Sequence, residues 1–272
     1  MASGVFWGLS WWPLKFFGAQ GLTAYTISLS AYAALSAVSL PLIWRERALW
    51  QPEWRALLAI GIFFGWANFA FTSALVSGSV VRAMLLFYLL PAWGAIGGKL
   101  FLQERLGARR LSAVALSLGG VAVILGGADA WSAPFSIADG MAITAGLAYT
   151  AAAIANRKAE RIPLVSRTLV SFVGCTLLAL LALPFAVPVF PAIDAAGWGL
   201  LLLYAFVWLL GGTVMTTYGV THMPASRAAV LQVVELLVAV GSAVLIGGEL
   251  LTRQDCIGGA MVLAATLIEA RS

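Results

Sequence analysis

The chain has 272 residues, of which 62% are apolar and only 10% are charged. Its mean hydropathy is +0.97. A soluble domain is about 45–50% apolar and about 25% charged, and its surface-to-volume ratio would leave too much of this apolar surface in water. The composition therefore excludes an ordinary water-soluble protein and indicates an integral membrane protein.

The net charge of +5 does not indicate nucleic-acid binding, because the sixteen Lys and Arg residues form short clusters between apolar runs. That pattern is typical of membrane topology signals. The two cysteines, Cys175 and Cys256, give no disulfide framework and no metal-binding spacing. We therefore expect no metal and no cofactor.

Ten apolar runs follow one another, each long enough or nearly long enough to cross a hydrocarbon core of about 30 Å. We expect spans at residues 2–18, 21–44, 54–75, 79–102, 111–128, 138–155, 166–188, 197–219, 225–247 and 255–270. The first run begins at Ala2 without a basic segment before it, so we interpret it as a span and not as a signal peptide. The sequence thus predicts an all-α membrane protein of ten transmembrane helices.

The basic residues predict an orientation. If the N-terminus is cytoplasmic, the cytoplasmic connections carry twelve Lys and Arg residues and the outer connections carry one, Arg253. Lys15, Arg82 and Lys99 make up the remaining three, within or at the margins of spans. Positive residues accumulate on the cytoplasmic side, so we expect both termini in the cytoplasm.

An internal repeat divides the chain. When Ser79–Leu106 is laid on Pro224–Leu251 at an offset of 145 residues, Arg82 meets Arg227 and Glu104 meets Glu249 without a gap. The fourth predicted span thus aligns with the ninth, an offset of five spans, and because five is odd, the second copy starts on the opposite side of the membrane. We expect two inverted five-helix repeats, residues 1–130 and 137–272, around a central cavity.

The chain resembles the EamA-type drug/metabolite transporter superfamily at several short motifs. They are Phe6-Trp7-Gly8, Tyr88-Leu89-Leu90-Pro91, Gln103-Glu104-Arg105-Leu106, Gly119-Gly120-Val121, Gly247-Gly248-Glu249-Leu250-Leu251 and Gly258-Gly259. The resemblance covers both halves and implies ten helices around a cavity and transport of amino acids, metabolites, nucleotide sugars or organic cations. The second half departs from the pattern, with Leu236 in place of the proline at Pro91 and Glu235 beside it.

A charge within a span is costly unless it lines a cavity or is paired, and three such residues stand out: Lys15, Arg82 and Glu235. Lys15 could instead snorkel to the interface, and Arg82 could anchor its span there. Glu235 is too short to snorkel, so it must face a cavity, pair with a cation such as Lys15 or Arg82, or be protonated.

Aromatic residues lie deep in several spans, where helix packing or a ligand cavity would explain them. Trp11 and Lys15 share one face of the first span, and Tyr204 and Trp208 share one face of the eighth. The predicted substrate-binding set is Trp11, Trp12, Lys15, Trp66, Asn68, Arg82, Tyr88, Trp93, Tyr149, Tyr204, Trp208, Gln232 and Glu235.

The favoured function is secondary transport, and specifically the export of an amino acid. Glu235 would bind the ammonium of the substrate, and Lys15 or Arg82 would bind its carboxylate. Proton coupling through Glu235 is an option. The alternative substrate is an organic cation or drug held by Glu235 and aromatic faces. A non-transporting membrane assembly protein is a third reading. Enzyme and ATP-driven pump are excluded, because the chain has no H-E-x-x-H, no G-x-S-x-G and no P-loop.

We expect the protein in the cytoplasmic membrane, of bacterial type, as a monomer or homodimer. The expected partners are the lipid bilayer and a small-molecule substrate, without nucleic acid.

Overall fold

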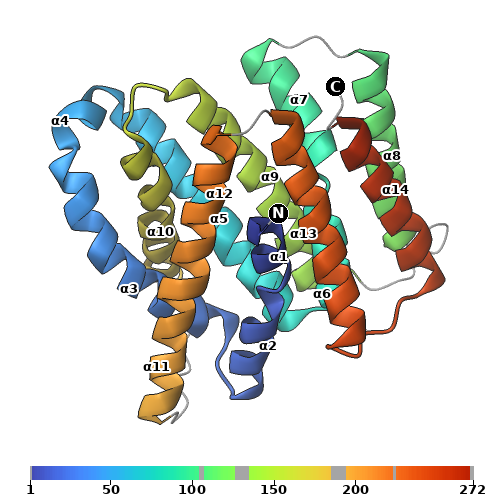
Figure 1. Cartoon of the computed structure of the whole chain (residues 1–272), viewed down its shortest axis with the longest axis horizontal. Helices are drawn as coiled ribbons and strands as arrows, with labels where there is room; N and C mark the ends of the chain where they lie inside the picture. The colour runs from blue at the N-terminus through green and yellow to red at the C-terminus, as the bar shows by residue number, and fades with distance from the viewer. Residues whose placement is uncertain (1, 104–106, 126–134, 185–193, 223–224, 270–272) are drawn as a thin grey trace.

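A computed structural model describes residues 2–103, 107–125, 135–184, 194–222 and 225–269. Within these ranges, side chains are described except at residues 2, 91, 102, 218–222, 225–233 and 269. The described residues form helices and short connections, without a strand (Figure 1). Glu104, the first glutamate of the predicted repeat, lies outside the described part.

Short connections separate the helices along the chain. In order they are α1 (Ala2–Gly8), α2 (Trp11–Ala19), α3 (Ala24–Arg45), α4 (Arg47–Trp50), η1 (Gln51–Glu53), α5 (Trp54–Ser77), α6 (Val80–Phe87), α7 (Leu90–Leu102), α8 (Ala108–Ile124), α9 (Ile137–Lys158), α10 (Leu164–Leu181), α11 (Ala195–Leu203), η3 (Tyr204–Leu210), α12 (Gly211–His222), α13 (Ala225–Leu245) and α14 (Arg253–Glu269).

Among the described residues, six helical segments are long and apolar enough to cross a membrane. They are Ala24–Arg45, Arg47–Ser77, Val80–Phe101, Ile137–Lys158, Leu164–Leu181 and Ala195–Thr217. The predicted first span is divided into two short helices, and α8 and α14 have 17 residues each. Large apolar side chains such as Leu181 (72% exposed) and Leu245 (86% exposed) face outward, as lipid contact requires.

Two of the predicted spans are broken near prolines. The first breaks at Leu9–Ser10, just before Pro13, and the fourth breaks at Tyr88–Leu89, just before Pro91. Proline has no N–H and clashes with the preceding turn, which interrupts the helix. The backbone N–H groups of Leu9, Ser10, Tyr88 and Leu89 at these breaks still bond to carbonyl oxygens of the preceding turn, so each break changes the direction of the span.

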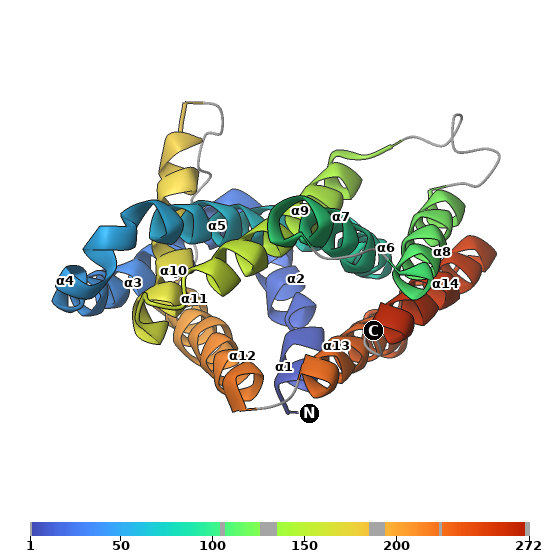
Figure 2. The same ribbon diagram turned by 90° about the horizontal axis from the view of Figure 1, so that it is seen from above.

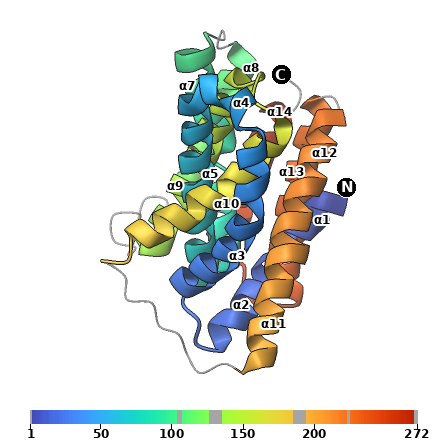
Figure 3. The same cartoon turned by 90° about the vertical axis from the view of Figure 1, so that its left-hand side faces the viewer.

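The eighth predicted span is continuous but changes its winding. α11, η3 and α12 form one rod (Figure 3), and η3 is a π-helix at Tyr204–Leu210. π-segments within α-helices are rare and are frequent at functional sites.

Helices approach most closely where glycines replace larger residues. α8 packs on α14 with Gly120 opposite Gly258: a Cβ added to Gly120 would lie 2.7 Å from the Gly258 carbonyl oxygen. α5 packs on α10 at Gly65, where an added Cβ would lie 2.5 Å from the Cys175 backbone nitrogen. Small residues of this kind allow close backbone packing of membrane helices. Figure 2 shows α8 and α14 side by side at one edge of the molecule, with α3 and α4 at the opposite edge.

The bundle has two ends, which we name after the broken fourth span. At the α6 end, α2, α5 and α13 end while α6, α9 and α14 begin; at the α7 end, α3, α7 and α9 end (Figure 1). The described basic residues gather at the α7 end: Arg45, Arg47, Arg55, Lys99, Arg109, Arg110, Arg157, Lys158, Arg161 and Arg167. Lys15, Arg82 and Arg253 lie toward the α6 end.

Candidate functional site

Glu235 lies midway along α13, opposite the end of α1. The two helices touch at Gly8, where an added Cβ would lie 2.8 Å from the Glu235 carbonyl oxygen and 2.8 Å from the Val238 Cβ. Protein surrounds Glu235, yet its side chain is only half-buried. A carboxyl group therefore lies deep among the helices with part of its surface still accessible.

The Glu235 carboxyl is hydrogen-bonded to Tyr88, whose side chain is 1% exposed. Tyr88 ends α6 at the break before α7, and this break directs the tyrosine toward α13. Tyr149 on α9 is near enough to interact electrostatically with Tyr88, and the Phe87 ring meets the Tyr149 ring edge-on with centroids 5.8 Å apart. α6, α9 and α13 thus bring one acid and several aromatic rings together.

No cation neutralises this acid within the part of the chain whose side chains are described. The ion pair found there joins Arg82 to Asp139, and Glu235 forms none with a Lys or Arg. The structure thus does not bring Lys15 or Arg82 to Glu235, and the predicted structural ion pair is not formed. A carboxyl group in such a place must be protonated or must meet a cation from elsewhere.

Lys15 lies near the α6 end, where its ammonium donates a hydrogen bond of 2.6 Å to the Gly78 carbonyl oxygen. It borders a hollow of about 420 Å³ between α2 and the end of α13, lined by Trp11, Trp12, Lys15, Phe16, Ile246, Gly247 and Glu249. Lys15 is half-buried and is bound to the Gly78 backbone carbonyl and not to Glu235.

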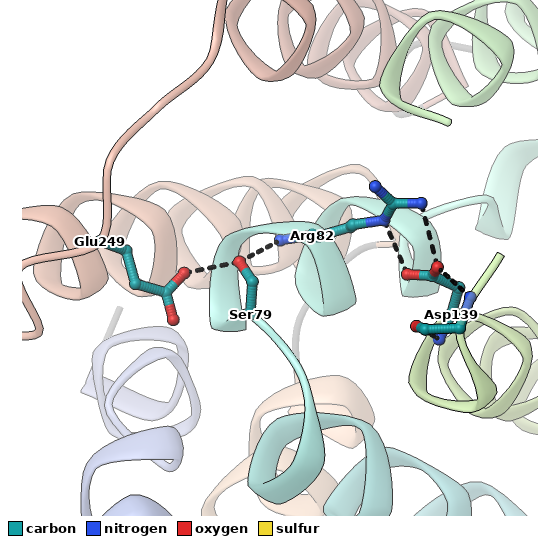
Figure 4. Close-up of polar contacts among 5 residues, drawn as sticks. Ser79, Arg82, Asp139 and Glu249 are labelled. Carbon is teal, nitrogen blue, oxygen red and sulfur yellow. Dashed lines mark hydrogen bonds and ion pairs between the residues drawn. The ribbon is translucent and has the colours of Figure 1, made fainter. Parts of the chain in front are cut away.

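Arg82 lies one turn into α6 and contacts Asp139 at the start of α9 (Figure 4). Its Nε and Nη2 donate to the two carboxylate oxygens at 2.7 and 3.0 Å. The Asp139 carboxylate also accepts from the Ser136 backbone N–H at 2.9 Å as part of a capping box. Arg82 therefore joins two helices and is not an isolated anchor.

Trp11 and Trp12 in the first span make different contacts. The Trp11 indole N–H donates to the Ser242 hydroxyl on α13 at 2.9 Å, in a buried contact. Trp12 is 56% exposed and faces the outside of the bundle beside Lys15. The structure therefore does not bring Trp12 to Glu235.

The π-helix carries two of the predicted residues. Trp208 stacks on Phe6, with centroids 4.5 Å apart, and its indole N–H donates to the Phe6 carbonyl oxygen at 3.0 Å. Tyr204 is buried among Phe17, Tyr32 and Cys175. The π-helix therefore packs against the first span, and Tyr204 belongs to a separate cluster from Glu235.

The remaining predicted residues lie on three helices. Trp66 and Asn68 are half-buried near the middle of α5, and Trp66 lies 6.1 Å from Phe69 between ring centroids. Trp93 on α7 has a buried indole nitrogen that finds no hydrogen-bond partner among the described residues. Gln232 belongs to α13, but its side chain lies outside the described part.

Two carboxylates in contact with α6 were not among the predicted residues. Asp139 could have been found from the capping-box pattern Ser136-x-x-Asp139 before an apolar run. Glu249 was visible as the glutamate of the repeat, but no sequence signal indicated what it contacts. Among the described residues, no three His, Cys, Asp or Glu side chains form a metal-binding group.

Apolar spans with glycine crossings and a half-buried acid beside aromatic rings are typical of a membrane transporter. Comparison with known families identifies the chain further: the model of the EamA-like transporter family matches it twice, at residues 1–126 and 136–269. The chain belongs to this family and is an integral, multi-pass membrane protein.

Two individual proteins are also similar to it. An uncharacterized transporter of Archaeoglobus fulgidus is 28% identical over 230 residues, which are 82% of this chain and 78% of the relative. A solved structure, described only as a crystal structure of a protein, has a TM-score of 0.63 at 18% identity and covers 98% of this chain and 95% of its own. At that identity the likeness concerns the fold alone.

Proposed function

We propose that the protein is a secondary transporter that moves a small amine-bearing metabolite by alternating access, with Glu235 as the group that receives the ammonium. The observation that carries the proposal is a half-buried acid, bonded to Tyr88, with no cation paired to it among the described side chains. The bound substrate would supply the missing positive charge.

Alternating access requires two structurally related halves, and we propose ten spans in two inverted repeats, residues 1–130 and 137–272. The helix contacts support this division. When the two halves are exchanged, the contact between α1 and α13 corresponds to the contact of α9 with α6 and α7. Both contacts are present. The same exchange maps the α8–α14 and α3–α10 pairs onto themselves, and these helices also pack together.

The gathering of basic residues at the α7 end supports an orientation with this end and both termini in the cytoplasm. The α6 end would then face outward from the cytoplasmic membrane. In this orientation we propose that substrate leaves the cell.

An amino acid remains the favoured substrate. Its ammonium would bind Glu235, and its apolar side chain would contact Tyr149 and neighbouring rings. Its carboxylate needs a donor, and the indole N–H of Trp93, which has no partner among the described residues, lies on α7 five residues along the chain from Tyr88. Lys15 could serve this role only after leaving the Gly78 carbonyl oxygen.

Proton coupling follows if the empty site is neutralised by a proton. A protonated Glu235 would release its proton when an ammonium arrives, so proton and substrate would exchange at one group. The expected result is antiport, in which one amine leaves the cell in exchange for the entry of one proton.

An organic cation is the second candidate, and a specific observation favours it. The two basic residues predicted to hold a carboxylate are bound elsewhere, Lys15 to Gly78 and Arg82 to Asp139. A cation without a carboxylate would need only Glu235 and the aromatic rings.

A matched set of compounds distinguishes these substrates. Purified protein in liposomes is assayed for counterflow of an apolar amino acid, its decarboxylated amine, its deaminated acid and a quaternary amine. The proposal expects flux of the amino acid and no flux of the acid. Flux of the two amines without the amino acid would favour the second candidate, and no flux of any ammonium compound would contradict both.

A further inference from the structure

The connection between α5 and α6, Gly78–Ser79, and the first turn of α6 are held by side chains from three other parts of the chain. Glu249, in the connection from α13 to α14, accepts hydrogen bonds from the Ser79 hydroxyl at 2.7 Å and from the Val80 and Val81 backbone N–H groups at 2.7 and 3.0 Å. The carboxylate therefore caps the N-terminus of α6, whose unsatisfied N–H groups favour an anion.

The turn after α13 places Glu249 there. Gly248 has a φ of +68°, which suits glycine, and the Glu249 N–H donates back to the Ala243 carbonyl oxygen at 3.1 Å. This turn ends α13 and directs the glutamate side chain across to α6 (Figure 4).

The other two contacts come from α2 and α9. Lys15 donates to the Gly78 carbonyl oxygen at 2.6 Å, and Arg82, in the first turn of α6, is bound to Asp139 on both carboxylate oxygens. We call Lys15, Gly78, Ser79, Arg82, Asp139 and Glu249 the α6 clasp. It ties α6 to α2, to α9 and to the end of α13.

The clasp differs from the other helix contacts in its chemistry. α5–α10 and α8–α14 are joined by close glycine packing, whereas the clasp consists of polar bonds at partly accessible groups: Ser79 is exposed, and Glu249, Lys15 and Arg82 are half-buried. Asp139 is buried, but its partner is Arg82 on α6 and not Glu249. Water can replace the bonds of the partly accessible Glu249 and Ser79 side chains when helices separate.

Hollows flank the clasp on both sides. The hollow of about 420 Å³ includes Lys15 and Glu249, and a second of about 140 Å³ is lined by Gly78, Ser79, Arg82, Ala83, Ser136, Ala138 and Asp139. Gly78 itself packs closely on α9, since an added Cβ would lie 2.8 Å from the Ala138 Cβ, but the hollows leave open space beside the start of α6, into which it can move.

We infer that Glu249 is a gating residue, whose bonds to the start of α6 hold the α6 end of the transporter closed and break when the substrate path opens there. The inference depends on the chain being a transporter and not on the proposed substrate. Glu249 does not contact the proposed substrate site; it acts by holding α6, which carries Tyr88 at its far end.

Distance measurements between spin labels test this without any substrate. Labels are attached at Ser77→Cys, at the end of α5, and Gln254→Cys, in the first turn of α14; both native positions are exposed. The exposed Cys256 is replaced by Ser, and Cys175 is buried. Glu249→Gln is compared with Glu160→Gln, which neutralises an exposed glutamate outside the clasp.

The parent and the Glu160→Gln control are expected to give mainly one short distance. Loss of a charge-assisted hydrogen bond predicts that Glu249→Gln raises the ratio of open to closed molecules by about tenfold, visible as a second, longer distance. Ser79→Ala removes the bond to Glu249 and the helix-cap bond that the Ser79 hydroxyl accepts from the Arg82 backbone N–H at 3.3 Å, but it keeps the charge of Glu249, so it should shift the same distribution less.

Identical distributions for the parent, Glu249→Gln and Ser79→Ala would overturn the inference and leave Glu249 as a static helix cap. If Glu249→Gln does not fold, Ser79→Ala alone decides between these outcomes. A negative result here leaves the counterflow test untouched, so the two proposals fail separately.

Discussion

Replacing Glu235 by glutamine removes a negative charge while keeping the shape of the side chain. Because no described Lys or Arg is paired with Glu235, the substitution leaves no buried cation behind. The glutamine carbonyl oxygen can still accept a hydrogen bond from the Tyr88 hydroxyl. We therefore expect the variant to fold, with a free energy of unfolding within about 1 kcal/mol of wild type or higher.

Binding should respond in the opposite way. A hydrogen bond to a charged group contributes about 1.5–3 kcal/mol, and every 1.4 kcal/mol is about tenfold in affinity. If Glu235 receives the ammonium of the substrate, affinity for an ammonium compound should fall about 10- to 150-fold. Because Glu235 is half-buried, we expect the loss of affinity to lie within this range and not at the lower limit that applies to solvent-exposed charges.

The two effects are measured on one preparation. Thermal unfolding in detergent reports stability, and its shift with ligand concentration reports affinity. Glu160→Gln, at an exposed position between α9 and α10, is the matched control and should change neither quantity.

The reasoning is refuted if Glu235→Gln binds the ammonium compound as tightly as wild type. A large loss of stability with unchanged affinity would instead show that Glu235 has a structural cation partner.

Three further predictions concern the fold and its orientation. Gly120→Val should destabilise the protein by about 1–3 kcal/mol in thermal unfolding, because a Cβ would lie 2.7 Å from a backbone carbonyl oxygen of α14; an unchanged midpoint would contradict this packing. Arg82→Gln should cost about 1–2 kcal/mol, since Arg82 is partly exposed but Asp139 is buried, and adding Asp139→Asn should recover part of it. A membrane-impermeant maleimide added outside intact cells should label the exposed Cys256 and not the buried Cys175; labelling of Cys256 only after cell lysis would reverse the proposed orientation.

The sequence predicted the helical class and the transporter family, because both depend on long-range regularities of composition and motif order. It could not predict where spans break. Pro13 and Pro91 are visible in the sequence, but whether a proline bends, breaks or merely begins a helix depends on the neighbouring helices. The π-helix at Tyr204–Leu210 has no local signal at all.

The site was predicted only in part, for a related reason. Burial of a short acidic side chain distinguishes Glu235 in the sequence, since few charges lie within apolar runs. Pairing is a tertiary property: Arg82 and Asp139 are 57 residues apart and meet only because α6 packs on α9. Lys15 shares a helical face with Trp11, yet its long side chain reaches Gly78 and not Glu235.

The most direct test of the account is counterflow of one labelled ammonium substrate in liposomes containing wild type or Glu235→Gln at equal protein content. The account predicts robust exchange by wild type and less than about a tenth of that rate in the variant at substrate concentrations below saturation. Equal exchange by the two proteins would contradict the central claim that Glu235 receives the positive charge of the substrate.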